Sequence, residues 1–366
     1  MPYTSHPKPM SYAEAVRTFN GQDVQDDVND ACGKLAHSMS AIMDKFEAIT
    51  KQMHTIDLLR LSAPLRPRWD SMRKDVAELL WQFRTNATVI SGRLKLFCTT
   101  VLPMAARNLE GRSGRSPYYN ENLQVMQSYM AISAEHAAYT RSLVERIFRL
   151  SAQLVAFLNE FTKLASRHAA SGQKEMCDLS MRLSELQNHV QQLFTTNGET
   201  SSSDVTHLLF TCSRIVSSAG RPGVRSKITR FQRVLDGDLT NVGRAYESAD
   251  RKRNEVAHAQ YASQLRQSRT DPLATAQTMV SAFLLDQMLT SESGSSLFLS
   301  IWSRLRTDCN EIFHWLKNPG QFAVPSVISC YAENGSTIFA PLASALDVYS
   351  TGIDPSLYGP ERREAR

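Results

Sequence analysis

The chain has 366 residues, of which 42% are hydrophobic and 21% charged, and 41 basic against 36 acidic residues give a formal net charge of +5. This hydrophobic content suffices for a buried core and excludes a wholly disordered chain, while the charged content excludes a protein built mostly of membrane-spanning helices. The mild basic excess gives no reason to expect nucleic acid as a partner, although it favours a weak attraction to anionic surfaces.

Residues 1–20 are predicted to form a flexible N-terminal segment. They contain Pro2, Pro7 and Pro9 and no apolar run, so they lack the pattern of a conventional secretory signal. We therefore expect a cytoplasmic protein that is either free or peripherally attached to a membrane. The six cysteines include no close pair, which predicts reduced and mostly buried thiols.

Two long apolar stripes follow, one at residues 24–56 and one at residues 69–101. In both, apolar residues recur every three or four positions, a period typical of amphipathic helices and not of strands. The segment between them, residues 61–67, contains Pro64 and Pro67. Because proline is tolerated at the start of a helix but not in its interior, the sequence predicts a helical hairpin with its turn here.

A third stripe at residues 125–164 and a fourth at residues 224–256 have the same period. Apolar spacing continues through residues 176–193, with Gly172 as a kink or short break. A stripe of ~30 residues rising 1.5 Å per residue would span on the order of 45 Å, and such stripes bury only against one another. We therefore predict an all-α fold over residues 21–318: an elongated antiparallel bundle of long, coiled-coil-like helices.

Residues 195–223, between the third and fourth stripes, are predicted to form a flexible apolar insert. Glycines and serines flank its apolar part, whose candidate membrane-contact residues are Leu208, Leu209, Phe210, Ile215 and Val216. Basic surface candidates follow directly: Arg221, Arg225, Lys227, Arg230 and Arg233. Apolar residues beside a basic cluster are typical of a membrane-touching element, but a short helix packed on the bundle has the same pattern.

The last third of the chain carries shorter apolar segments. Asp271 and Pro272 are predicted to open a helix that the serines of residues 291–296 close, and a further helix follows over residues 297–316. We predict that residues 319–366 form an irregular C-terminal cap and tail, in which the Glu-Asn-Gly sequence at residues 333–335 marks either a small hairpin or part of the irregular cap.

The chain contains no phosphate loop, nucleophile elbow, His-Glu-x-x-His motif or dinucleotide fingerprint. The strongest catalytic pattern is a pair of Glu-x-x-His motifs, Glu255 with His258 and Glu311 with His314. In a helical bundle, two such helices and two further glutamates can form a di-iron carboxylate site. Because these motifs lie off the centres of the apolar stripes, we expect no metal, no cofactor and no enzymatic activity, with a di-iron enzyme as the third alternative.

The order of the elements resembles the long-helix pore-forming toxins of the cytolysin A and xenorhabdolysin type. The resemblance covers residues 24–316 and consists of four heptad-like stripes with an apolar insert between the third and fourth. It is architectural, because no family motif matches residue for residue, the insert is short, and no secretion signal is present. The resemblance implies an insert that leaves the bundle, enters a bilayer and drives assembly of a ring-like oligomer.

Long amphipathic helices with a mild basic excess are also similar to BAR-type membrane-curving dimers and to tethering bundles. This second resemblance implies a scaffold or tether whose partner is a second copy of the chain, another helical protein or an anionic membrane. Besides the cluster at residues 221–233, its basic face has four candidates: Arg66, Arg68, Arg73 and Lys74. A scaffold is our main hypothesis and pore formation the alternative. An exposed apolar insert would favour pore formation, and a buried insert with a basic face would favour the scaffold.

Overall fold

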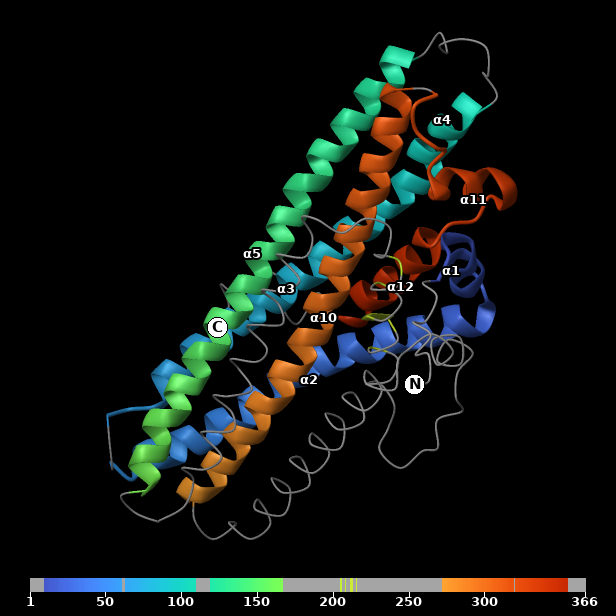
Figure 1. The fold of residues 1–366 in the computed structure, drawn as a ribbon. Helices are drawn as coiled ribbons and strands as arrows, with labels where there is room; N and C mark the ends of the chain where they lie inside the picture. The colour runs from blue at the N-terminus through green and yellow to red at the C-terminus, as the bar shows by residue number, and fades with distance from the viewer. Residues whose placement is uncertain are drawn as a thin grey trace, which may run out of the picture.

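The computed structural model describes residues 10–60, 63–109, 119–166, 272–318 and 320–354, together with positions 205, 208, 211, 212 and 215. These residues are helical wherever they form regular structure, which confirms the predicted all-α class (Figure 1). The body of this part consists of four long helices: α2 (Gln22–Leu58), α3 (Arg66–Leu96), α5 (Tyr119–Ser166) and α10 (Pro272–Lys317). The predicted helix at residues 224–256 and the continuation past Gly172 lie outside the described residues.

The predicted hairpin between the first two long helices is confirmed. Helix α2 ends at Leu58, and α3 begins at Arg66 with a proline in its first turn. The carboxylate of Asp57 accepts hydrogen bonds from the backbone amides of Leu65, at 2.7 Å, and Arg66, at 3.0 Å. Asp57 thereby satisfies amides at the start of α3 that have no acceptor within the helix, and it holds the two helix ends together.

Helix α3 ends in a change of helical type. A π-helical turn at Phe97–Val101 leads into α4 (Leu102–Ala106) and a 3-10 turn at Arg107–Leu109. Pro103 lies in the first turn of α4. Because proline has no amide hydrogen and its ring crowds the preceding turn, the widened π-turn lets the helix continue through it.

The helical stretch Arg66–Leu109 is long and apolar enough to cross a membrane, with a mean hydropathy of 1.2 over its 18-residue window. In the protein, 39% of that window is buried. Core helices of soluble proteins have the same length and composition. Most of the apolar residues between Phe83 and Phe97 lie in the core, although Leu96 is exposed.

One aromatic residue from each of the four long helices meets in a fully buried cluster. Phe46 of α2 lies 4.8 Å from Trp69 of α3 and 4.5 Å from Phe283 of α10, measured between ring centroids. Phe157 of α5 lies 5.4 Å from Trp69. The indole N–H of Trp69 donates to the backbone carbonyl of Phe46 at 3.2 Å, so the polar atom of the largest ring is also satisfied.

Two helices replace the irregular C-terminal cap that the sequence predicted for residues 319–366. Helix α11 (Ser326–Asn334) ends at Gly335, whose φ of 62° is left-handed and whose amide donates to the carbonyl of Tyr331 at 2.8 Å. The Glu-Asn-Gly sequence therefore terminates a helix and does not form the predicted hairpin. Helix α12 (Phe339–Gly352) packs against both α2 and α3 and belongs to the core.

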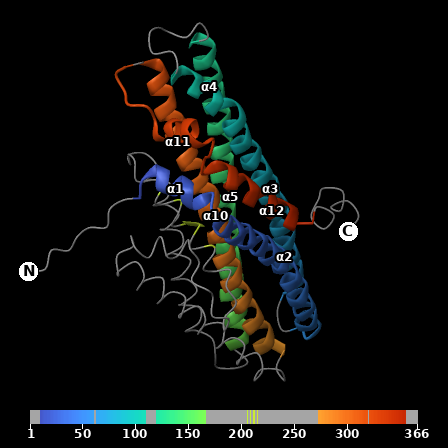
Figure 2. The same ribbon diagram turned by 90° about the vertical axis from the view of Figure 1, so that its right-hand side faces the viewer.

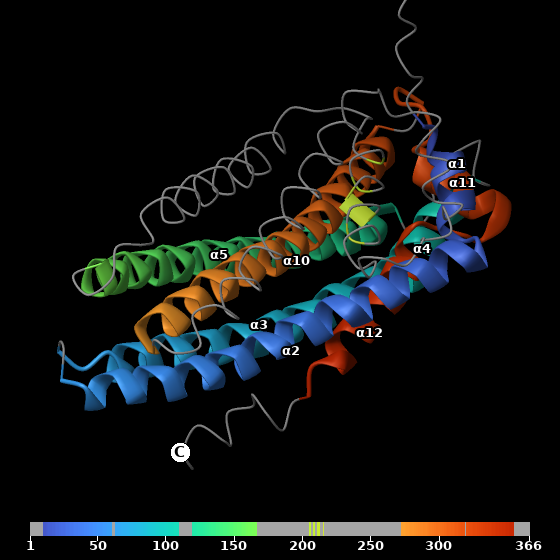
Figure 3. The same cartoon turned by 90° about the horizontal axis from the view of Figure 1, so that it is seen from below.

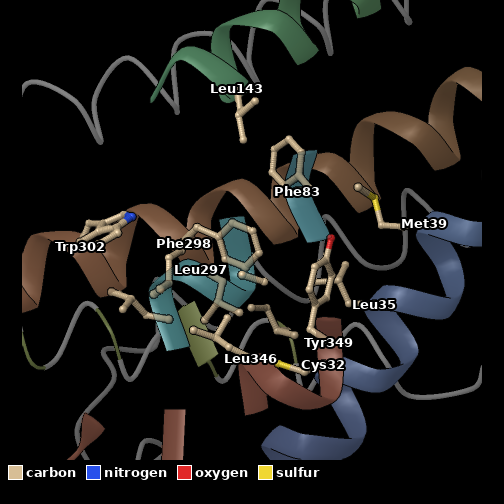
Figure 4. Close-up of a cluster of buried hydrophobic side chains, with 14 of the residues drawn as sticks. Cys32, Leu35, Met39, Phe83, Leu143, Leu297, Phe298, Trp302, Leu346 and Tyr349 are labelled. Atoms are coloured by element: carbon tan, nitrogen blue, oxygen red, sulfur yellow. The ribbon is translucent and has the colours of Figure 1, made fainter. Parts of the chain in front are cut away.

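A second buried cluster, around Phe298 of α10, shows how α12 joins the core (Figure 4). The ring of Phe298 stacks on Phe83 of α3, with centroids 5.8 Å apart, and meets Tyr349 of α12 edge-on at 5.5 Å. Cys32 and Leu35 of α2 line the same cluster.

The predicted break at residues 291–296 is also wrong, because α10 runs through it without interruption (Figure 3). Ser295, Ser296 and Ser300 are all buried, and Gly294 faces Leu35 of α2. Serine and glycine have low helix propensity, but small residues allow close packing, and burial against neighbouring helices outweighs propensity here.

The remaining short helix, α1 (Tyr12–Phe19), begins with a capping box formed by Ser11 and Glu14. It lies beside α11, which in turn lies beside α4 (Figure 2). The sequence predicts a flexible segment for this part of the chain, residues 1–20. Its described part, from residue 10 onward, instead contributes the buried residues Val16 and Phe19 to the core.

Candidate functional site

The described positions of the apolar insert lie in the core. Leu208 and Ile215, two of the membrane-contact candidates, are buried, as are Val205 and Cys212. The hydroxyl of Thr211 lies 3.1 Å from that of Ser300 in α10, a buried hydrogen bond that joins the insert to the bundle. Three further candidates, Leu209, Phe210 and Val216, lie outside the described residues.

The second set of candidates is basic. Arg221, Arg225, Lys227, Arg230 and Arg233 lie outside the described residues. The arginines suggested for a basic face of the first hairpin form ion pairs: Arg66 with Asp70 at 3.4 Å, Arg73 with Glu47 at 2.7 Å, and Arg68 with Glu160. The hydrogen bond from Arg68 lowers the pKa of the Glu160 carboxyl. Part of the positive charge expected on this face is therefore used to join α3 to α2 and α5.

The Glu-x-x-His candidates are not brought together by the described structure. Glu255 and His258 lie outside it, and His314 is exposed at the end of α10, where its ring lies 6.2 Å from that of Phe322. Among the described residues, no group of three or more His, Cys, Asp or Glu side chains could hold a metal ion.

A buried ion pair that was not predicted from the sequence lies in the second half of α10. Arg304 and Asp308, one helical turn apart, form a salt bridge and are both buried. The hydroxyl of Tyr12 in α1 donates to the other carboxylate oxygen of Asp308 at 3.1 Å, and the Arg304 guanidinium lies 5.3 Å from the centre of the Tyr12 ring. This triad joins the N-terminal helix to the longest C-terminal one.

The electrostatics of the triad follow from its burial. Burial on its own lowers the pKa of Arg304, but the charge of Asp308, its hydrogen bond and Tyr12 together outweigh this effect and raise the pKa above its ordinary value. Burial also raises the pKa of Tyr12 well above its ordinary value, and the negative charge of Asp308 raises it further. The arginine thus stays charged and the tyrosine stays neutral at physiological pH.

A second set of buried, hydrogen-bonded side chains joins three long helices. The Thr140 hydroxyl of α5 lies 3.1 Å from Oδ1 of Asn86 in α3 and accepts a hydrogen bond from the indole N–H of Trp302 in α10 at 2.8 Å. The ring of His136 stacks on Trp302 with centroids 6.4 Å apart. Asn86 is the first residue of an Asn-x-Thr sequon, but its burial leaves no access for a glycan.

The described cysteines carry free thiols, as the sequence predicts: Cys32, Cys98, Cys212, Cys309 and Cys330. Burial raises the pKa of Cys32 to about 12 and raises those of the others as well. Because the thiolate is the reactive form, these protonated thiols, buried except for the half-buried Cys98, are poor nucleophiles at neutral pH.

The hairpin tip between α2 and α3 carries two adjacent exposed leucines, of which Leu58 is the most exposed large hydrophobic residue of the described structure. Leu58 is 68% exposed and Leu59 is 50% exposed. Arg60 follows in a left-handed conformation with φ of 55°, and it is exposed as well. The tip therefore presents two adjacent leucines beside a positive charge, which is the combination that favours contact with an anionic interface.

Comparison with known proteins gives no match: no protein-family model, no curated protein and no solved structure is similar to the chain.

Proposed function

We propose that this protein is a non-enzymatic helical scaffold or tether that acts through contact with other proteins or with a membrane surface. The observation that carries the proposal is the burial of Leu208 and Ile215, together with the hydrogen bond between Thr211 and Ser300. Insert positions held in the core in this way contribute to the stability of the bundle. A buried insert favours a scaffold over a protein poised to insert an apolar tongue.

The engagement of the buried polar groups supports the same proposal. The carboxylate of Asp308 accepts from Tyr12 and pairs with Arg304, and Thr140 connects Asn86 to Trp302. Each group joins helices that are distant in sequence, as expected of a protein whose function depends on keeping one shape.

The tip of the α2–α3 hairpin is the surface through which we propose membrane contact. Leu58 and Leu59 can enter the headgroup region, while Arg60 interacts with anionic lipid. This mode of contact needs no unfolding of the bundle, and it agrees with a cytoplasmic protein that is peripheral at a membrane. Another helical protein or a second copy of the chain would bind along the sides of the bundle.

Pore formation is the second candidate, and one observation favours it: the stretch Arg66–Leu109 has the length and hydropathy of a membrane span. Insertion of this stretch would remove Phe83 and Phe97 from the aromatic contacts they make with Phe298 and Tyr129. It would also break the packing of α3 against α12. The cost of that rearrangement makes the scaffold the better supported function.

The test is co-sedimentation of the full chain with phosphatidylcholine vesicles that contain or lack phosphatidylserine, with calcein release recorded on the same vesicles. We expect binding to the anionic vesicles without release, and binding that weakens as salt screens the charges. Replacing Leu58 and Leu59 by serine should reduce binding. The matched control is Leu96→Ser, which changes an exposed leucine at the other end of α3.

Release of calcein would contradict the scaffold proposal and favour pore formation. Binding that is unaffected by salt and by the two serine substitutions would exclude the hairpin tip as the membrane-contact surface. If the protein binds neither kind of vesicle, the proposed partners are restricted to other proteins.

A further inference from the structure

A series of charge contacts runs along one side of the α2–α3 hairpin and ends near its tip on two basic groups. Arg73 of α3 pairs with Glu47 of α2 at 2.7 Å, and its Nε lies 3.8 Å from Oδ1 of Asp70. Asp70 also pairs with Arg66 at 3.4 Å. Nearest the tip, Nη1 of Arg66 lies 3.5 Å from Nδ1 of His54 in α2. Acids and bases alternate along this series until its last pair, which contains no acid.

The acid nearest to His54 in sequence already has partners. Asp57 lies about one turn after His54, and its carboxylate oxygens accept the backbone amides at the start of α3 at 2.7 Å and 3.0 Å. Lys51 lies about one turn before His54, and both of these side chains are exposed. The hairpin tip therefore places two positive groups, Lys51 and Arg66, beside a histidine, while the nearest carboxylate caps α3.

Two of these groups lie on the same face of α2 as the most exposed leucine of the tip. Residues three and four apart are neighbours on a helix surface, so Lys51, His54 and Leu58 form one row. Leu58 follows His54 by four residues, or about 6 Å of helix rise. Apolar groups of an interfacial element are buried about 5–10 Å into the boundary between headgroups and acyl chains. When the tip enters that boundary with Leu58, His54 lies at the level of the lipid phosphates.

The protonation state of His54 decides what the pair can bind. The neutral imidazole can accept a hydrogen bond from the Arg66 guanidinium, whereas the imidazolium has only donors. A protonated His54 therefore repels Arg66 at the observed 3.5 Å separation of their nitrogens. A phosphate oxygen between the two cations would accept from both and remove this repulsion. Anion binding and protonation of His54 consequently favour each other.

We propose that His54 and Arg66, with Lys51 beside them, form a binding site for the phosphodiester of an anionic phospholipid, and that protonation of His54 strengthens binding at acidic pH. This inference rests on the proposed function, since it names the groups of the hairpin tip that contact the lipid headgroup. A lipid phosphodiester stays ionised between pH 5 and 8, the range in which histidine ordinarily changes its charge. The pH response therefore belongs to the protein.

The other charged groups near His54 do not change charge in this pH range. In the hairpin they are two acids and three bases: Lys51, Asp57, Arg60, Arg66 and Asp70. Residues 272–285, which open α10, contain no Asp, Glu, Lys, Arg or His. On α5, Glu160 is paired with Arg68. Helix α12 approaches α2 at Gly33 and Ala36, about 27 Å along the helix from His54. Among these groups, His54 is therefore the one that titrates between pH 5 and 8.

The first experiment is co-sedimentation of the full chain with phosphatidylcholine vesicles that contain phosphatidylglycerol, at pH 5.5 and 7.5 and equal ionic strength. One added positive charge near an anionic surface strengthens binding about fivefold, so acidification should strengthen binding about fivefold less in His54→Gln than in the unmodified chain. His54→Lys, with its fixed charge, should bind at pH 7.5 about as tightly as the unmodified chain does at pH 5.5. The matched control is His37→Gln, an exposed histidine of α2 about 26 Å from His54, which should keep the full response.

The second experiment contains no membrane. The imidazole C–H resonance of His54, identified by its loss in His54→Gln, is titrated with pH by NMR in dimethyl phosphate and in sodium chloride of equal ionic strength. Dimethyl phosphate is a soluble phosphodiester that stays ionised throughout the titration. We expect a higher titration midpoint in dimethyl phosphate, because the bound anion favours the imidazolium. Arg66→Gln removes the second cation of the site and should abolish this difference.

Two results would overturn the site: a vesicle response to pH that His54→Gln leaves unchanged, or a His54 titration that is the same in dimethyl phosphate and in chloride. Binding to anionic vesicles together with either result would keep the hairpin tip as a membrane contact and exclude His54 and Arg66 as its phosphate site. A higher midpoint in dimethyl phosphate without vesicle binding would support the phosphodiester site and contradict the proposed membrane contact. Failure of the site is therefore distinguishable from failure of the proposed function.

Discussion

Tyr12 donates a hydrogen bond to Asp308 at 3.1 Å, although 296 residues separate the two in sequence. Asp308 also accepts from Arg304, and the two charges are buried together. In the described structure, Nε of Arg304 has no hydrogen-bond partner. The carboxylate of Asp308 is therefore the main group that compensates the Arg304 guanidinium for its lost hydration. The connection between α1 and α10 is therefore electrostatic as well as apolar.

Asp308→Leu should strongly destabilise the protein, because it leaves Arg304 charged and buried without its partner. We expect a loss of about 3–5 kcal/mol in the free energy of unfolding, measured by urea titration. The double variant Arg304→Met with Asp308→Leu should recover most of this loss, since it removes both charges and keeps similar volumes. Tyr12→Phe, which removes one hydrogen bond to the charged carboxylate, should cost about 1.5–3 kcal/mol.

Equal losses in the single and double variants would show that the charges do not compensate one another. The far-ultraviolet circular dichroism of each variant serves as the control, because the comparison holds only while the helices remain intact.

Two glycine substitutions should change stability in opposite directions. At Gly352 of α12, an added Cβ would lie 2.8 Å from the Cβ of Ala36 in α2, so Gly352→Ala should cost about 1–3 kcal/mol. At Gly294, in the interior of α10, the nearest atom to an added Cβ would be Cδ2 of Leu35 at 3.9 Å. Gly294→Ala should therefore stabilise the protein by about 0.5–1 kcal/mol through higher helix propensity. Thermal unfolding of both variants checks the pair, and stabilisation by Gly352→Ala would contradict the close approach of α12 to α2.

Stability should fall at alkaline pH. Burial raises the pKa of Cys32 to about 12 from an ordinary value of 9.0, and it raises those of Tyr12, Tyr129 and Tyr349 above their ordinary value of 10.0. The folded state therefore holds protons that the unfolded state releases above about pH 9, so the free energy of unfolding decreases as pH rises beyond that value. Below about pH 8 these groups are protonated in both states and contribute almost no pH dependence.

Urea midpoints at pH 8, 9, 10 and 11 measure this decrease. The pH dependence should be shallower in Cys32→Ala, which removes one of the titrating groups. A stability that is flat from pH 8 to pH 11 would contradict the burial of these groups.

The helices of the first half of the chain follow from local signals in the sequence. Apolar spacing and the prolines at residues 64 and 67 set the end of α2 and the start of α3, because both signals act within a few residues. The course of α10 through residues 291–296 and the helical state of α12 depend instead on packing against α2 and α3. The helix propensities of the residues in those two segments do not predict this packing.

The surface features were predictable only in part. Periodicity placed Val125, Ile132 and Tyr139 on the right helix, but it could not show that these three apolar residues of α5 are exposed. The Arg304 and Asp308 pair left a signal, since both charges fall between Ile301 and Ile312 on the buried face of α10. The third residue of the triad, Tyr12, lies in a distant segment, and no local sequence pattern connects it to Arg304 and Asp308.

The place of α12 between α2 and α3 has a consequence for the order of events on the ribosome. The hydroxyl of Ser91 in α3 donates to the carbonyl of Ala343 in α12, a contact between residues 252 positions apart. Translation therefore completes the α2–α3 hairpin long before the helix that fills its groove is made. Until α12 is made, the apolar residues of α2 and α3 that it later covers have no partner from α12, and such transiently exposed apolar surface is prone to aggregation.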